Sequence, residues 1–271
     1  MSTRLILLTN DDGVESPGLW AAAASLKPLG EVVIVAPMTQ CTSVGRAMPP
    51  TYSGRIERRT FSVNGSMWHA FAVDASPALA VQHAALEILP RQPDLVVAGI
   101  NFGENIGSAV TVSGTVGAAM EGASLGVPAL AISQETDPAH YYTHSTDVDF
   151  TAAAHFTQLF ARLLLTRPLP FDVDLLKVEV PLGATPQTPW RLTRLSRTRY
   201  YLPVKPQRSD LLQPGQITAI NRLEPERLEP DSDVYALVVD RCVAVTPLSL
   251  DLTSRVSLKE LAERLGKVEG T

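Results

Sequence analysis

Hydrophobic residues in the first half of the chain fall into two alternating patterns. Continuous apolar runs, typical of strands buried on both faces, occupy 4–9 (RLILLT), 31–36 (EVVIVA), 94–100 (DLVVAGI) and 128–133 (PALAIS). Helical periodicity lies between and after these runs, at 17–29, 76–89, 114–125 and 147–165. Strands that alternate with helices predict an α/β fold with a Rossmann-like, doubly wound, mainly parallel sheet.

Residues 51–73 interrupt this order. Apolar and polar residues alternate there, and the segment contains the dipeptide Asn64-Gly65. An Asn-Gly pair between alternating runs is a strong hairpin signal, so we expect an antiparallel excursion from the main sheet.

The last third of the chain has a different character, because 11 of the 21 prolines lie between Pro168 and Pro247. Apolar runs at 175–180 and 234–245 predict two further strands, and 257–265 predicts a short helix. We expect a single domain over 1–271. Its parts are a catalytic core at 1–180, a hairpin or arm at 181–245 with a strand that returns to the core, and a tail helix within 246–271.

Composition narrows the classes of function. Hydrophobic residues make up 45% and charged residues 19%, a globular mixture. The net charge of −5 argues against long nucleic acid as a partner. No stretch is typical of a membrane span or a signal peptide, and the two cysteines, Cys41 and Cys242, make no disulfide framework. We therefore expect a soluble, cytoplasmic protein.

Polar loops follow two of the predicted strands. Asn10, Asp11 and Asp12 come directly after the first strand, and Asn101 follows the third. Thr42 and Ser43 offer hydroxyl groups in the loop after the second strand. Carboxyl ends of parallel strands meet at one sheet edge, and adjacent carboxylates there favour a hard divalent cation. The competing interpretation of Asp-Asp-Gly is an ordinary turn.

A helix is predicted to begin at Ser113-Gly114-Thr115. The free N–H groups of a helix N-terminus can hold a phosphate, although Ser113 is equally suited to be a plain N-cap. A cation beside a phosphate cradle predicts a phosphomonoesterase, in which the cation polarises the phosphoryl group and activates a water.

Three strings carry a family resemblance: LLTNDDGVESPGL, PDLVVAGINFGENIG and SGTVGAAMEGASLGVPALAIS. They closely resemble the SurE family of survival-protein nucleotidases. The resemblance implies a nucleotidase that uses one divalent metal ion per subunit, Mg²⁺ or Mn²⁺, and acts on nucleoside 5′- and possibly 3′-monophosphates. It also implies a homodimer or homotetramer formed through a C-terminal arm.

The resemblance also assigns site residues. Asp11 and Asp12 match the catalytic and metal-binding carboxylates, Asn101 matches the amide ligand, and Thr42 stands where the family usually has a serine ligand. The remaining matches, which fall on the phosphate-binding positions or beside the hydroxyl ligand, are Asn10, Ser43, Asn105, Ser113, Gly114 and Thr115.

The sequence departs from the family pattern at several positions. Ser108-Ala109 replace a common acidic pair, and Glu179 replaces a frequent asparagine. These changes leave open an alternative in which the chain is a non-catalytic nucleotide- and metal-binding module. His140 and His144 lack the context of a zinc site, and we interpret them as surface histidines of a loop over the site.

Overall fold

The computed structural model describes residues 3–63, 65–221 and 223–266. Nine strands form the main sheet: β1 (Leu5–Thr9), β2 (Glu31–Pro37), β3 (Ile56–Val63), β4 (Ser66–Val73), β5 (Leu95–Phe102), β6 (Ala129–Gln134), β7 (Leu175–Val180), β8 (Trp190–Leu192) and β11 (Val243–Leu248). The α-helices are α1 (Pro17–Leu26), α2 (Pro77–His83), α3 (Gly114–Ser124), α4 (Thr151–Thr166), α5 (Asp233–Val238) and α6 (Leu258–Arg264).

The strand order in the sheet is β3-β4-β2-β1-β5-β6-β7-β11-β8. The central strands pair in parallel, whereas β3 runs antiparallel to β4 and β11 runs antiparallel to β7. The mainly parallel α/β fold and the antiparallel hairpin after β2 are therefore confirmed; Asn64, in the expected turn, lies outside the described residues.

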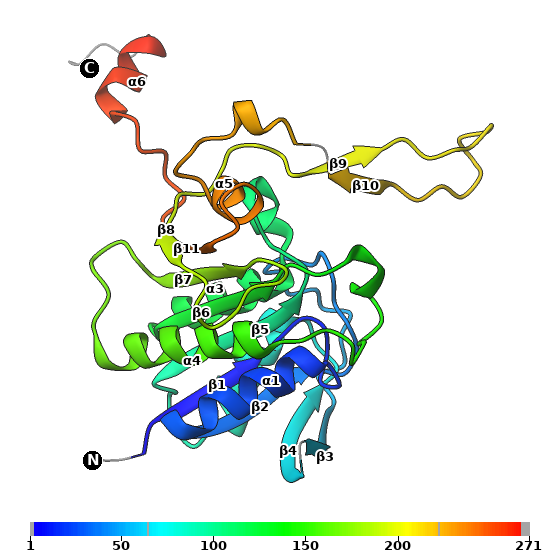
Figure 1. Ribbon diagram of the computed structural model, residues 1–271, viewed down its shortest axis with the longest axis vertical. Helices are drawn as coiled ribbons and strands as arrows, with labels where there is room; N and C mark the ends of the chain where they lie inside the picture. The colour runs from blue at the N-terminus through cyan, green and yellow to red at the C-terminus, as the bar shows by residue number, and fades with distance from the viewer. Residues whose placement is uncertain (1–2, 64, 222, 267–271) are drawn as a thin grey trace.

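Helices cover both faces of the sheet (Figure 1). Alternate side chains of β1 point to opposite faces: Ile6 and Leu8 pack with residues of α1 and α4, while Leu7 packs with residues of α2 and α3. Because both faces are covered, all five residues of β1 are buried, which explains why this strand is a continuous apolar run.

The prediction of a strand at 234–245 is wrong for the first half of that range. Residues Asp233–Val238 form helix α5, and the strand begins only at Val243. The Ser232 hydroxyl caps the helix by accepting from the Tyr235 N–H at 3.2 Å. Val234 and Leu237, one helical turn apart, both pack in a small core with Ile106. An apolar run alone did not distinguish this helix from a strand.

The expected hairpin in the last third is present as β9 (Tyr201–Val204) and β10 (Thr218–Asn221), which pair antiparallel. This hairpin and α6 extend away from the main sheet (Figure 1). Among the helices of the described ranges, none is long and apolar enough to cross a bilayer.

Candidate functional site at the carboxyl edge of the sheet

Asp11 lies directly beyond the carboxyl end of β1 and is 5% exposed. Its Oδ1 accepts a hydrogen bond from the Thr115 hydroxyl at the start of α3. Gly114 is packed so closely that an added Cβ would lie 2.7 Å from Asp11 Oδ2, and therefore only glycine fits there. Burial raises the pKa of Asp11 to about 6, although hydrogen bonds with Thr115 and Gly114 oppose the shift.

Asp12 is 2% exposed and faces the next strand. Its Oδ2 accepts from the Phe102 N–H at 3.0 Å, and its Oδ1 accepts from Gln40 Nε2 at 3.1 Å. Burial and then the neighbouring charge of Asp11 raise the pKa of Asp12 well above its usual range. No cationic side chain is among the groups that shift either aspartate's pKa.

The loop after β2 is joined to the loop after β1 through the backbone. The Cys41 N–H donates to the Asp11 carbonyl at 2.7 Å, and the Val14 N–H donates to the Pro37 carbonyl at 2.9 Å. These bonds bring the exposed residues Thr42 and Ser43 to the loop that carries both aspartates.

Two asparagine amides are fixed in this region by their nitrogen ends. Asn101 Nδ2 donates to the Gly103 carbonyl at 2.7 Å and to the Phe102 carbonyl at 3.2 Å, so Oδ1 is the end of the amide turned away from that backbone. Asn10 Nδ2 donates to the Gly13 carbonyl at 2.9 Å. Asn10 Oδ1 is buried and has no hydrogen-bond partner.

Asn105 and Ser113 make local contacts. Asn105 Nδ2 donates to Ser133 Oγ at 3.0 Å, at the end of β6. Ser113 Oγ accepts from the Val116 N–H at 3.1 Å, which is the N-cap role weighed from the sequence. The structure thus brings Asp11, Gly114 and Thr115 into direct contact, with Asp12 beside them, while Asn105 is held by neighbours of its own.

Sequence reasoning did not single out Gln40 or Tyr141. Gln40 Nε2 bridges Asp12 Oδ1 and the Tyr141 carbonyl, the latter at 2.8 Å. His144 Nε2 lies 2.7 Å from the Asp12 carbonyl, and because a carbonyl only accepts, this nitrogen carries the proton. The 137–149 loop therefore contacts the site as expected, but its histidines are half-buried rather than surface residues. Nothing local in the sequence marks these contacts, since Gln40 and Tyr141 are 101 positions apart.

Donor chemistry limits what this edge can hold. Within the described ranges, no three His, Cys, Asp or Glu side chains are grouped so that they could hold a metal ion. The available donors are two carboxylates, amide oxygens and hydroxyls, a set suited to hard cations such as Mg²⁺ or Mn²⁺ and unsuited to zinc. Asn10 Oδ1 has no partner, and no cationic side chain of the described residues pairs with the aspartates; both observations fit an added positive ion.

Fold and site together define a Rossmann-like α/β protein with a buried carboxylate pair at the carboxyl edge of its sheet, against the N-terminus of a helix. The family model described as survival protein SurE matches residues 6–201. The chain belongs to the SurE family.

Known proteins match nearly the whole length of this chain. A protein of Thermococcus kodakarensis named 5′-nucleotidase SurE is 40% identical over 260 residues, covering 96% of this chain and 98% of the relative. A relative of the same name from Methanocella arvoryzae is 41% identical, covering 93% of this chain and 94% of the relative. The crystal structure of a SurE protein from Aquifex aeolicus has a TM-score of 0.75 and 30% identity, covering 96% of this chain and 99% of that one.

Proposed function

We propose that this chain is a metal-dependent 5′-nucleotidase, a phosphomonoesterase that releases phosphate from nucleoside 5′-monophosphates and also accepts 3′-monophosphates. The relatives named 5′-nucleotidase SurE support the reaction class. One observation carries the assignment to this site: two adjacent carboxylates are buried at the N-terminus of α3, and no described residue supplies them with a cationic partner.

The proposed ligands of a single Mg²⁺ or Mn²⁺ ion are Asp11, Asp12, the Asn101 amide oxygen and the hydroxyl of Thr42 or Ser43. A bound divalent ion supplies Lewis-acid polarisation of a phosphoryl oxygen and a lower pKa for a bound water. Phe102 and Gln40 hold the Asp12 carboxylate in one orientation.

The remaining proposed contacts are to phosphate. Ser113, Gly114 and Thr115 begin α3, where N–H groups and the helix dipole favour an anion. The Asn105 amide, directed by Ser133, is a further proposed contact, and Asn10 holds the turn that carries both aspartates. Asp11 or Asp12 would accept the proton of the attacking water.

The test is phosphate release from a panel of nucleoside 5′- and 3′-monophosphates, with Mg²⁺, with Mn²⁺ and with chelator. We expect release with metal only, and losses of about 10³-fold or more for Asp11→Ala and Asp12→Ala, because each removes a charged ligand of a cation that contributes several kcal/mol. Full activity in chelator would reject the metal. Tight nucleotide binding without phosphate release would favour the non-catalytic alternative.

The β9–β10 hairpin is the proposed arm for self-association. Apolar side chains at its tip are strongly exposed, with Leu211 at 82%, Leu212 at 91% and Ile217 at 72%. Burial of such a patch by a second copy of the chain would remove this apolar surface from water. Light scattering on the full chain should give a dimer or tetramer, and Leu211→Asp with Leu212→Asp should lower the mass toward that of one chain.

A further inference from the structure

Residues 101–107 lead from the end of β5 to the turn before α3, and they carry the proposed amide ligand Asn101 and the proposed phosphate contact Asn105. Within this segment Asn105 is half-buried, whereas its neighbours are buried. The Asn105 side chain therefore reaches the edge of the site from a loop that is otherwise packed inside. The groups that hold this loop in place decide where the Asn105 amide lies.

The main chain of Asn105 is bonded on both sides by side chains of β7. Its N–H donates to Glu179 Oε2 at 2.8 Å, and its carbonyl accepts from Lys177 Nζ at 2.9 Å. Lys177 and Glu179 are two positions apart on one strand, so both side chains lie on the same face of the sheet. Both are fully buried, which screens these bonds from solvent. The position of Asn105 is thus set by a neighbouring strand and not by its own loop alone.

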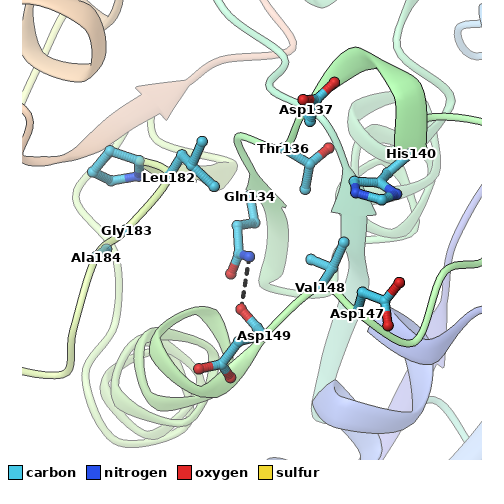
Figure 2. Close-up of a pocket in the computed structure, with 11 residues that line it drawn as sticks. Gln134, Thr136, Asp137, His140, Asp147, Val148, Asp149, Leu182, Gly183 and Ala184 are labelled. Atoms are coloured by element: carbon cyan, nitrogen blue, oxygen red, sulfur yellow. Dashed lines mark hydrogen bonds between the residues drawn. The ribbon is translucent and has the colours of Figure 1, made fainter.

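The side chain of Asn105 is bonded from the same row of the sheet. Ser133 of β6 pairs with Glu179 of β7 in the parallel register, and Asn105 Nδ2 donates to Ser133 Oγ at 3.0 Å. Gln134, the next residue of β6, turns to the opposite face, where its amide donates to the Asp149 carbonyl at 2.8 Å in the wall of a separate cavity (Figure 2). An amide nitrogen carries two hydrogens, so Asn105 Nδ2 keeps one for a further acceptor such as a phosphate oxygen.

Asp233 of α5 fixes the same loop at a second point. Its Oδ2 accepts from Lys177 Nζ at 3.1 Å and from the Gly107 N–H at 3.0 Å. Gly107 has a φ of 58°, and an added Cβ would lie 2.7 Å from the Thr198 carbonyl oxygen, so this turn requires glycine. The backbone is therefore held on both sides of Ile106 by one group of buried charged side chains.

The charge of this group does not itself attract an anion. One ammonium group stands against two carboxylates, so no excess of positive charge is offered to a phosphate. What the group offers the site is hydrogen bonds to the main chain of Asn105. Glu179 is also a position at which the sequence departs from the frequent asparagine of the family.

We propose that Glu179, together with Lys177, is a positioning residue for phosphate binding, which holds the Asn105 peptide so that the Asn105 amide faces the phosphate. The inference rests on the proposed nucleotidase site, in which Asn105 contacts phosphate. A misplacement of about 1 Å in a binding group can reduce catalysis by about 10²-fold. Loss of the bond from Asn105 to Glu179 should therefore weaken phosphate binding and leave binding of the divalent cation intact.

Two variants separate the position of Asn105 from the charge of Glu179. Glu179→Gln removes the charge and keeps an acceptor for the Asn105 N–H, whereas Glu179→Met removes the charge and both oxygens from a side chain of similar length. In each variant Lys177 keeps Asp233 as its partner, so no buried charge is left uncompensated. Glu179→Leu, which also lacks an acceptor, repeats the test should the methionine variant not fold.

Asp94→Leu is the matched control. Asp94 accepts from the Leu5 N–H at 2.8 Å and pairs with Arg91 at 2.8 Å, but it lies at the amino end of β1, the edge of the sheet opposite the site. Its loss should lower the melting temperature without changing phosphate binding.

Calorimetry on the full chain measures the dissociation constant of inorganic phosphate at saturating Mg²⁺, and that of Mn²⁺ without phosphate. We expect Glu179→Met to weaken phosphate binding about tenfold, near the worth of one hydrogen bond to a charged group, and to raise KM for a nucleoside 5′-monophosphate. Its Mn²⁺ binding should be unchanged. Glu179→Gln and Asp94→Leu should bind phosphate within about twofold of the wild-type protein.

The outcomes separate this inference from the proposed activity. A wild-type protein that binds phosphate but releases none from nucleotides would reject the activity, and the positioning role would stand if Glu179→Met still weakened phosphate binding. The positioning role is overturned if the wild-type protein binds no phosphate, or if Glu179→Gln and Glu179→Met have equal effects. It is also overturned if Glu179→Met lowers only the melting temperature, or weakens Mn²⁺ binding as much as phosphate binding.

Discussion

Two pairs of buried carboxylates, Asp11 with Asp12 and Glu179 with Asp233, differ in what compensates their charge. At the carboxyl edge of β1, Asp11 and Asp12 are buried beside each other, and the donors to their carboxylates among the described residues are neutral: Thr115, Gln40 and the Phe102 N–H. At β7 and α5, the carboxylates of Glu179 and Asp233 are fully buried but flank the ammonium group of Lys177, at 3.3 Å and 3.1 Å.

The second group holds backbone in place. Lys177 Nζ donates to the Asn105 carbonyl at 2.9 Å, and Glu179 Oε2 accepts from the Asn105 N–H at 2.8 Å. Asp233 Oδ2 accepts from the Gly107 N–H at 3.0 Å. Although burial lowers the pKa of Lys177, attraction to Glu179 and Asp233 raises it above its usual range, so the lysine stays charged.

The comparison shows that buried carboxylates can stabilise a loop in one part of the fold and be available to a ligand in another. A chain that supplies its own ammonium group uses buried carboxylates to fix a loop. The Asp11–Asp12 pair, for which no such group is found among the described residues, is the proposed position of an external cation. Removal of the Lys177 charge should therefore lower the free energy of unfolding. Removal of one carboxylate of the Asp11–Asp12 pair should leave it unchanged or raise it, because the repulsion between the two charges disappears.

The largest expected effect on stability is that of Lys177→Met, which leaves two buried carboxylates without their cation. We expect the free energy of unfolding to fall by about 3–5 kcal/mol in urea denaturation at pH 7.5. Arg264→Met, which breaks an exposed ion pair with Glu260, is the matched control and should cost about 0.5 kcal/mol or less. Asp12→Asn in chelator should leave stability unchanged or raise it; a loss equal to that of Lys177→Met would contradict the distinction between the two groups.

Added metal should stabilise the folded protein through the Asp11–Asp12 pair and not through the Lys177 group. At a free Mn²⁺ concentration of about 100 times the dissociation constant, binding to the folded state should stabilise it by about 2.7 kcal/mol. Thermal unfolding with and without Mn²⁺ measures this shift, which should disappear in Asp12→Asn and persist in Lys177→Met. A shift retained in Asp12→Asn would place the cation elsewhere.

Without metal, the two groups should respond to pH with the same sign. The pKa of Asp11 is raised from 3.8 to about 6, so the folded state holds this proton more tightly than the unfolded chain. The corresponding stability is present below about pH 4 and is lost as pH rises through about 6. Burial likewise raises the pKa of Glu179, from 4.5 to about 7, although the charge of Lys177 opposes the shift.

The pKa shifts of Asp11 and Glu179 can be checked by measuring the free energy of unfolding in chelator from pH 4 to 8. Each shift is read from the difference between the wild-type protein and a variant that lacks the carboxyl group. Relative to Asp11→Asn, the wild-type protein should lose stability up to about pH 6, and relative to Glu179→Gln, up to about pH 7. A difference that grows in favour of the wild-type protein as pH rises would mean that the carboxylate is stabilised in its charged form, contrary to this account.

The smallest expected effect concerns the hydroxyl ligand. Thr42 directly follows Cys41, whose N–H donates to the Asp11 carbonyl, so we expect Thr42→Ala to weaken Mn²⁺ binding by about fivefold, near 1 kcal/mol. Ser43→Ala should change the affinity less. Titration of Mn²⁺ by calorimetry measures both, and the opposite order would assign the ligand to Ser43.

Sequence patterns predicted much of the fold because the signals are local. Continuous apolar runs identified β1, β2, β5, β6 and β7, and Asn64-Gly65 marked the β3–β4 hairpin. The apolar run that begins at Val234 predicts a strand but forms helix α5, because a short apolar run fits either form; the Ser232 N-cap is a local signal for the helix.

The candidate site was predicted in part for the same reason. Parallel strands bring their carboxyl ends to one edge of a sheet. Asp11, Asp12 and Asn101 could therefore be expected at the same edge, because each lies at the carboxyl end of a predicted strand. Gln40 and Tyr141, which meet at Asp12 from distant loops, could not.

By itself, the sequence determined the strand and helix periods, the position of the acidic loop and the family of the chain, since these depend on residue spacing and on strings of neighbouring residues. Only the tertiary structure decided which buried carboxylates are compensated: Asp233 reaches Lys177 across 56 positions, and no such partner reaches Asp11 or Asp12 within the described chain. The physical reason is that charge compensation depends on distance in space and on burial, and both arise only when remote segments pack together.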